Sequence, residues 1–96
     1  MKVRFLSCAE DELDKAIDYY EAKETGLGLR FLSEVRDSVE RIVLYPEAWH
    51  HLSCNTHRCR TKVFPFGIIY QIRKNELLIV AIAALHREPE YWKDRI

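Results

Sequence analysis

Apolar residues at helical spacing predict a first helix over about residues 9 to 24. They recur at three- and four-residue intervals, which places them on one face: Leu13, Ala16, Ile17 and Tyr20. Ser7 and Glu10 have the spacing of a capping box, which predicts a side-chain cap at the start of this helix. Tyr20 is expected to face the core and Tyr19 to lie at its rim.

A second apolar stripe predicts another helix, which directly follows the first. Gly26 and Gly28 interrupt the first helix, and Pro46 comes just past the end of the second. The stripe consists of Leu32, Val35, Val39, Ile42 and Val43. The two helices are therefore expected to form a hairpin with its turn at Thr25–Gly28.

The second half of the chain has the patterns of β-strands. His57–Val63 alternates strictly, so that Arg58, Arg60 and Lys62 share one face while Cys59, Thr61 and Val63 share the other. Ile68–Ile72 is the next predicted strand, between turns at Phe64–Gly67 and Arg73–Glu76. Leu77–Leu85 is apolar throughout, which indicates a strand buried on both faces.

With a short alternating strand over Lys2–Leu6, the element order is strand, helix, helix and three strands, followed by a tail. This order predicts one α+β domain over residues 1–96, in which the helical hairpin packs on a mainly antiparallel sheet. No run reaches the roughly 18 to 20 apolar residues of a membrane span. We therefore expect a cytoplasmic protein with no membrane partner.

Charge is balanced overall but differs between the halves. The net charge is zero; residues 1–48 hold 7 Lys/Arg against 11 Asp/Glu, and residues 49–96 hold 8 against 4. Neutrality argues against tight, nonspecific binding of nucleic acid. The basic half favours a face for an anionic partner.

Cys54, His57 and Cys59 cluster in the sequence, with His50 and His51 nearby, and these residue types are the usual ligands of zinc. No Cys-x-x-Cys knuckle is present, so the spacing fits no structural zinc pattern. We expect no metal and no other cofactor. Cys8 and Cys59 are expected to act as small apolar residues in strands.

Chemically active side chains gather where the apolar strand ends. His86 and Arg87 follow it directly, and Tyr91 and Trp92 come next in the tail. Rigid strand ends with such residues commonly recognise phosphates or other anions. The alternative is that the chain simply leaves the core for water there. Trp49 is expected to cap the core, and Trp92 to be the more exposed tryptophan.

Several strings, in this order along nearly the whole chain, resemble the RelE/ParE superfamily of toxins from type II toxin–antitoxin systems. No single string is diagnostic, but the ensemble is specific. The strings are Glu12-Leu13, Ala16, Tyr19-Tyr20-Glu21, Gly26-Leu-Gly28, Phe31, Pro46-Glu-Ala-Trp49, Arg58-x-Arg60, Phe64-Pro65-Phe66-x-Ile68-x-Tyr70, Ile79-Val-Ala-Ile82 and His86-Arg87-x-Pro89-x-Tyr91-Trp92-x-x-Arg95.

The resemblance implies a toxin of plasmid-stabilisation type that a cognate antitoxin neutralises. ParE-like members poison DNA gyrase, whereas RelE-like members cut mRNA on the ribosome. The neutral charge and the Tyr-Tyr-Glu and Gly-Leu-Gly strings favour a non-catalytic, ParE-like gyrase inhibitor. Its expected target-binding residues are Arg58, Arg60, Lys62, Arg73, Arg87, Tyr91 and Trp92.

The alternative is a metal-independent, ribosome-dependent endoribonuclease. Such an enzyme needs cations for the phosphate and groups that move a proton. The candidate catalytic residues would then be Arg60, His86, Arg87 and Tyr91. A third possibility is an inactive or differently targeted relative, whose basic stripe is a solvated sheet face that the antitoxin covers.

Overall fold

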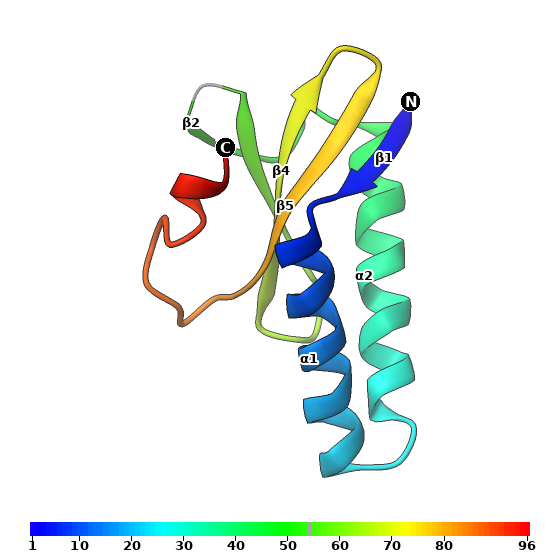
Figure 1. Cartoon of the computed structure of the whole chain (residues 1–96). Coiled ribbons are helices and arrows are strands. Elements are labelled where there is room, and N and C mark those ends of the chain that lie inside the picture. The colour runs from blue at the N-terminus through cyan, green and yellow to red at the C-terminus, as the bar shows by residue number, and fades with distance from the viewer. Residues whose placement is uncertain (54) are drawn as a thin grey trace.

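A helical hairpin covers one face of a mixed sheet, as the sequence predicted (Figure 1). The computed structural model describes residues 1–53 and 55–96. Within these residues the sheet has five strands in the order β1-β5-β4-β3-β2; β1 runs parallel to β5, and the other pairs are antiparallel. The elements are β1 (Lys2–Phe5), α1 (Ser7–Lys23), α2 (Leu27–Leu44), β2 (His50–Ser53), β3 (Thr56–Arg60), β4 (Phe66–Arg73), β5 (Glu76–Ala84) and a 3-10 turn, η1 (Lys93–Arg95).

The first helix begins differently from the prediction. Its N-cap residue is Leu6, which makes no side-chain cap, so the predicted Ser7–Glu10 capping box is wrong. Leu6 is extended and donates its N–H to the carbonyl of Ile79, while its own carbonyl accepts from Ala9 and Glu10. Because β1 leads directly into the helix, the carbonyl of Leu6 accepts the first helical N–H groups in place of a side-chain cap. Ser7 therefore already lies in the first turn of the helix.

The hairpin turn depends on Glu21 and two glycines. Gly26 has φ 90°, a left-handed conformation that favours glycine. A Cβ on Gly28 would lie 2.8 Å from the carbonyl oxygen of Ile17, so this position needs glycine for close helix packing. The Glu21 carboxylate accepts hydrogen bonds from the N–H groups of both glycines. These contacts give one structural reason for the presence of both Glu21 and the Gly26-Leu-Gly28 string.

Strand β2 was missing from the sequence prediction. It is a short edge strand whose residues are mostly exposed, so it has no inside–outside alternation to detect. The basic strand was in turn predicted too long: β3 ends at Arg60, and Val63 is 73% exposed instead of facing the core. A turn follows at Thr61, whose hydroxyl donates to the backbone carbonyls of Phe64 and Phe66.

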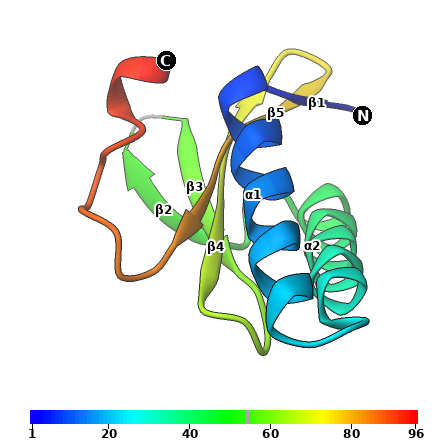
Figure 2. The same ribbon diagram turned by 60° about the horizontal axis from the view of Figure 1, so that its bottom comes forward.

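Strand β5 is buried on both faces, which confirms the prediction for the apolar run. The helices cover one face, and the C-terminal tail crosses the other, as Figure 2 shows. A bulge opposite the Ile69–Tyr70 step leaves Val80 without a paired residue, so Val80 and Ala81 both join the tail-side cluster. Trp92 belongs to that cluster and is only 6% exposed, so its predicted exposure was wrong. The tail adds the second apolar cover that the strand requires.

The helix-side core has an aromatic centre. Tyr20 contacts the rings of Phe31, Phe64 and Phe66, while Tyr19 is 57% exposed, as predicted. Trp49 packs against the same core, which confirms its capping role. Cys59 is a buried core residue in a strand, but Cys8 is exposed on α1, contrary to prediction.

Candidate functional site

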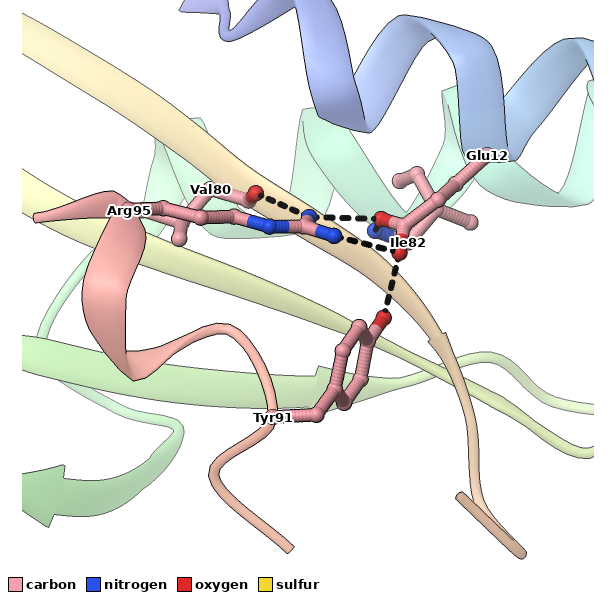
Figure 3. Close-up of polar contacts among 5 residues, drawn as sticks. All are labelled: Glu12, Val80, Ile82, Tyr91 and Arg95. Atoms are coloured by element: carbon pink, nitrogen blue, oxygen red, sulfur yellow. Dashed lines mark hydrogen bonds and ion pairs between the residues drawn. The ribbon is translucent and has the colours of Figure 1, made fainter. Parts of the chain in front are cut away.

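The tail is fastened to the sheet by the carboxylate of Glu12, on the first half of α1 (Figure 3). Both carboxylate oxygens accept from the Arg95 guanidinium at 2.9 Å, and Oε2 also accepts from the Tyr91 hydroxyl at 2.7 Å. Oε1 additionally accepts the backbone N–H of Ile82 at 3.0 Å, and Arg95 donates to the carbonyl of Val80. We call this arrangement the Glu12 clamp: Glu12, Tyr91, Arg95, Val80 and Ile82.

The position of the clamp follows from the sheet. Strand β1 pairs with β5 only as far as Ile79, so within residues 1–53 and 55–96 the outer edge of β5 beyond that point has no strand partner. Edge N–H and C=O groups that are buried need other partners. Glu12 and Arg95 provide them, so the clamp completes the sheet edge and anchors the tail at once.

The clamp also perturbs the titration of its members. Burial by itself would raise the pKa of Glu12, but hydrogen bonds from Arg95, Tyr91 and Ile82 outweigh it and lower that pKa. Burial and the hydrogen bond to Glu12 raise the pKa of Tyr91 far above its ordinary value. The bond to Glu12 likewise raises the pKa of Arg95. Around neutral pH the clamp is a carboxylate held by a protonated phenol and a guanidinium.

Arg87 rests on the aromatic ring of the clamp. Its guanidinium carbon lies 3.9 Å from the centroid of the Tyr91 ring, a cation–π contact. It forms no ion pair with a carboxylate in the described part of the chain. Its charge therefore remains available to a partner.

Arg87 and Arg58 line one cavity of about 250 Å³ between the sheet and the tail. The Arg58 side chain lies across β4, since a Cβ on Gly67 would lie 3.0 Å from it. Its Nε is buried and has no hydrogen-bond partner among the residues that the structure describes. The cavity, which we call the tail cavity, has apolar walls and acidic residues at its tail side. Its other lining residues include Leu52, Ile69, Glu88, Glu90, Tyr91 and Trp92.

The remaining predicted site residues are not all close to this cavity. Arg60 is exposed at the end of β3, on the same strand face as Arg58, and Lys62 is exposed in the loop that follows. Arg73 ends the central strand β4 at the opposite end of the β4–β5 pair, where it donates to the side chain of Gln71. The structure thus brings together Arg58, Arg87, Tyr91 and Trp92, and it separates Arg73 from them.

His86 lies on another side of the strand end. It lines a groove of about 470 Å³ beside α1, whose lining includes Lys15, Tyr19, Phe66, Ile82 and Arg87. We call this the α1 groove. Arg87 borders both hollows, whereas Arg58 and Tyr91 line only the tail cavity.

Sequence reasoning did not assign Glu12 and Arg95 to the site. Both belong to the strings that carry the family resemblance, and this was the available signal. Their pairing spans 83 positions, and neither strand nor helix periodicity relates residues so far apart.

The histidine and cysteine cluster was predicted to hold no metal, and this stays a prediction because Cys54 lies outside the described residues. Within residues 1–53 and 55–96, no three His, Cys, Asp or Glu side chains form a group that could hold a metal ion. The ring of His57 stacks on Tyr70 with centroids 5.4 Å apart. Burial, and then His51, lower the pKa of His57.

Among the described residues, no helix is long and apolar enough to span a membrane. No curated protein sequence matches the chain significantly. One solved structure, described as the chromosomal ParDE TA system from P. aeruginosa, resembles it with a TM-score of 0.69. Identity is 20%, and the alignment covers 90% of this chain and 97% of the other, so this similarity supports the fold. The family model described as the ParE toxin of the type II toxin–antitoxin system parDE matches residues 3–91, and the chain therefore belongs to that toxin family.

Proposed function

We propose that this toxin acts in the cytoplasm by binding DNA gyrase, without catalysing a reaction, and that a cognate antitoxin neutralises it. The family supports the toxin and antitoxin parts of this proposal. The proposed target-binding surface comprises the tail cavity and its basic rim. Its residues are Arg58, Arg60, Lys62, Arg87, Tyr91 and Trp92.

The environment of Tyr91 is the observation that carries the non-catalytic part. A general base must accept a proton near neutral pH. The phenol of Tyr91 instead donates to a carboxylate 2.7 Å away, and its pKa is raised. Tyr91 thus serves as a fixed ring beneath Arg87, which suits recognition better than proton transfer.

The location of His86 supports the same conclusion. RNA cleavage without a metal needs its proton-transfer groups and its phosphate-binding cations around one scissile bond. His86 lines the α1 groove, whereas Arg58 and Tyr91 line the tail cavity. The two proton-transfer candidates, His86 and Tyr91, therefore line different hollows, and Arg87 borders both.

For the antitoxin we propose the α1 groove as one contact. Its apolar members include Tyr19 and Phe66, and Lys15 and Arg87 lie beside them. An antitoxin segment that folds on binding could bury the apolar members and place acidic residues against the cations. Copurification after co-expression with the neighbouring reading frame tests this contact. Separate elution of the two proteins would contradict it.

The target is tested by running a gyrase supercoiling assay beside a ribosome-coupled mRNA cleavage assay. We expect Arg87→Glu to abolish growth inhibition and gyrase inhibition, because it reverses the unpaired charge over Tyr91. Lys74→Glu, a reversal in the turn between β4 and β5, is the matched control and should retain both activities.

His86→Gln and Tyr91→Phe separate binding from catalysis. A binder should lose much less in either variant than in Arg87→Glu, since Tyr91→Phe keeps the ring under Arg87 and removes only its hydrogen bond to Glu12. Loss of a proton-transfer group in a ribonuclease typically costs about 10²- to 10⁴-fold in rate. Codon-phased mRNA cuts that vanish in these variants would overturn the gyrase proposal and favour the ribonuclease alternative.

A further inference from the structure

A continuous series of contacts leads from the acidic first helix to the basic target-binding surface. Glu12 binds the hydroxyl of Tyr91, and the ring of Tyr91 carries the guanidinium of Arg87 at 3.9 Å. Arg95, which Glu12 holds through two hydrogen bonds, lies 5.1 Å from the same ring. The carboxylate of Glu12, which lines the α1 groove and not the tail cavity, thus contacts the residue whose ring carries Arg87.

We propose that Glu12 is a positioning residue for target recognition: it fixes the tail so that Arg87 stays stacked on Tyr91 at the tail cavity. This inference rests on the proposed function, because it concerns the same surface. It assigns a role in that surface to a residue of the acidic half of the chain, on the helix-covered side of the sheet.

The chemistry of the clamp requires a carboxylate. Its two oxygens accept from Tyr91, from Ile82 and twice from Arg95. A glutamine amide offers one acceptor oxygen, and its NH₂ group would face donors. Glu12→Gln therefore keeps the shape of the side chain but leaves the Tyr91 hydroxyl and the Arg95 guanidinium competing for one acceptor.

Apolar packing of the tail does not replace this restraint. Trp92 is buried against the sheet and anchors the middle of the tail. Tyr91 is only half-buried, and Arg87 lies before it in an exposed stretch. Without the clamp, Trp92 can keep the tail docked while the Tyr91–Arg87 stack is free to rearrange. We thus expect loss of recognition in a protein that remains folded.

The test compares Glu12→Gln with two controls. Glu76→Gln breaks a chemically matched arginine pair at the other end of β5, where Arg4 donates to both oxygens of Glu76. Ile42→Val weakens the core on the helix side and controls for lost stability. Gyrase inhibition is measured at equal folded protein, as judged by circular dichroism. We expect about tenfold weaker inhibition for Glu12→Gln, and a change within about twofold for both controls.

A second readout follows Tyr91 itself. Ultraviolet absorbance of the phenolate gives a titration curve, and Tyr91→Phe identifies which part belongs to Tyr91. In the wild-type protein Tyr91 should ionise at higher pH than an ordinary tyrosine. In Glu12→Gln its pKa should fall only part of the way toward the ordinary value of about 10, because burial, the larger cause, remains. Ile42→Val, which changes the helix-side core and not the clamp, should leave this curve unchanged.

Either of two results overturns the inference. One is that Glu12→Gln inhibits gyrase as strongly as Ile42→Val does, and the other is that the pKa of Tyr91 is the same in Glu12→Gln and in the wild type. If Glu12→Gln does not fold, Arg95→Gln breaks the same clamp from the tail and is judged by inhibition alone, because the charge of Arg95 lowers the pKa of Tyr91 and its loss would not return that pKa toward the ordinary value. If the wild-type toxin leaves gyrase unaffected, the target proposal fails by itself. Growth inhibition then replaces the gyrase assay, and the same comparison of variants judges the role of Glu12.

Discussion

The two ends of strand β5 carry the same chemical motif in different surroundings. At its start, Arg4 donates to both oxygens of Glu76 through Nε and Nη2, and their side chains are 47% and 22% exposed. At its far end, Arg95 donates to both oxygens of Glu12 through Nη1 and Nη2, and these side chains are only 20% and 16% exposed. The second pair also binds Tyr91 and two backbone groups of the strand.

Burial and partner number therefore distinguish a surface ion pair from a structural clamp. Solvent screens an exposed pair, which often contributes little to stability. Removing one partner of a pair sheltered from water leaves charges and polar groups unsatisfied. The clamp end also borders the tail cavity, so that stability and recognition coincide there.

The largest expected difference between the two ends is functional. Charge reversal at Arg87, at the clamp end, should abolish toxicity. Arg73→Glu, beside the Arg4–Glu76 end, should change gyrase inhibition by less than about threefold, because Arg73 lies away from the tail cavity. The inhibition assay measures both variants under one set of conditions. Equal loss in the two would mean that the recognition surface spans the whole sheet.

The second largest expected difference between the two ends of β5 is in their contribution to stability. Glu12→Gln is expected to lower the free energy of unfolding by about 2 to 3 kcal/mol, because it leaves Arg95 and Tyr91 short of acceptors. Glu76→Gln should produce no measurable change. Urea denaturation followed by circular dichroism gives both values. Similar losses at the two ends would show that burial is not the deciding variable.

The pH dependence provides a smaller and more specific test. Since the pKa of Glu12 is lowered in the folded protein, its contribution is complete above the unfolded value of about 4.3 and is lost as the pH falls through the lowered folded value. The stability difference between wild type and Glu12→Gln should thus be constant above pH of about 5.5 and shrink in more acidic solution. Unfolding curves across that range measure it. A difference that grows on acidification would contradict the assignment of an ionised Glu12.

Salt should have the smallest effect, and mainly at the exposed end. Raising the ionic strength to about 1 M shortens the screening length to about 3 Å. Any contribution of the Arg4–Glu76 pair should disappear, while that of the sheltered clamp should largely persist. Denaturation of the two glutamine variants and the wild type at low and high salt makes this comparison. If high salt abolished the stability difference between Glu12→Gln and the wild type, the clamp would be exposed to solvent and not sheltered from it.

Local patterns were sufficient to predict much of this molecule. The stripes through Leu13 and Val35 predicted two helices, and the apolar run from Leu77 predicted a strand covered on both faces. These properties depend on the spacing of apolar residues, and that spacing repeats every turn or every second residue. The ensemble of short strings was likewise enough to identify the superfamily.

The tertiary structure decided where those local features meet. Trp92 looked exposed because it follows a charged tail segment, yet it fills the second face of the sheet. Val63 looked buried because it continued an alternation that Thr61 interrupts with side-chain hydrogen bonds. Strand β2 had no pattern of its own and exists through its pairing with β3.

The site shows the same division. The residue types at the end of β5 were visible in the sequence, but the separation of Arg73 from Arg87 follows from the direction of the strands. Glu12 lies on an acidic helix turn that has an ordinary solvent-facing composition. It becomes part of the site only because β1 stops short of the end of β5 and the tail returns across it. Periodicity encodes which face of an element is buried, whereas contacts between distant segments depend on how all the elements pack together.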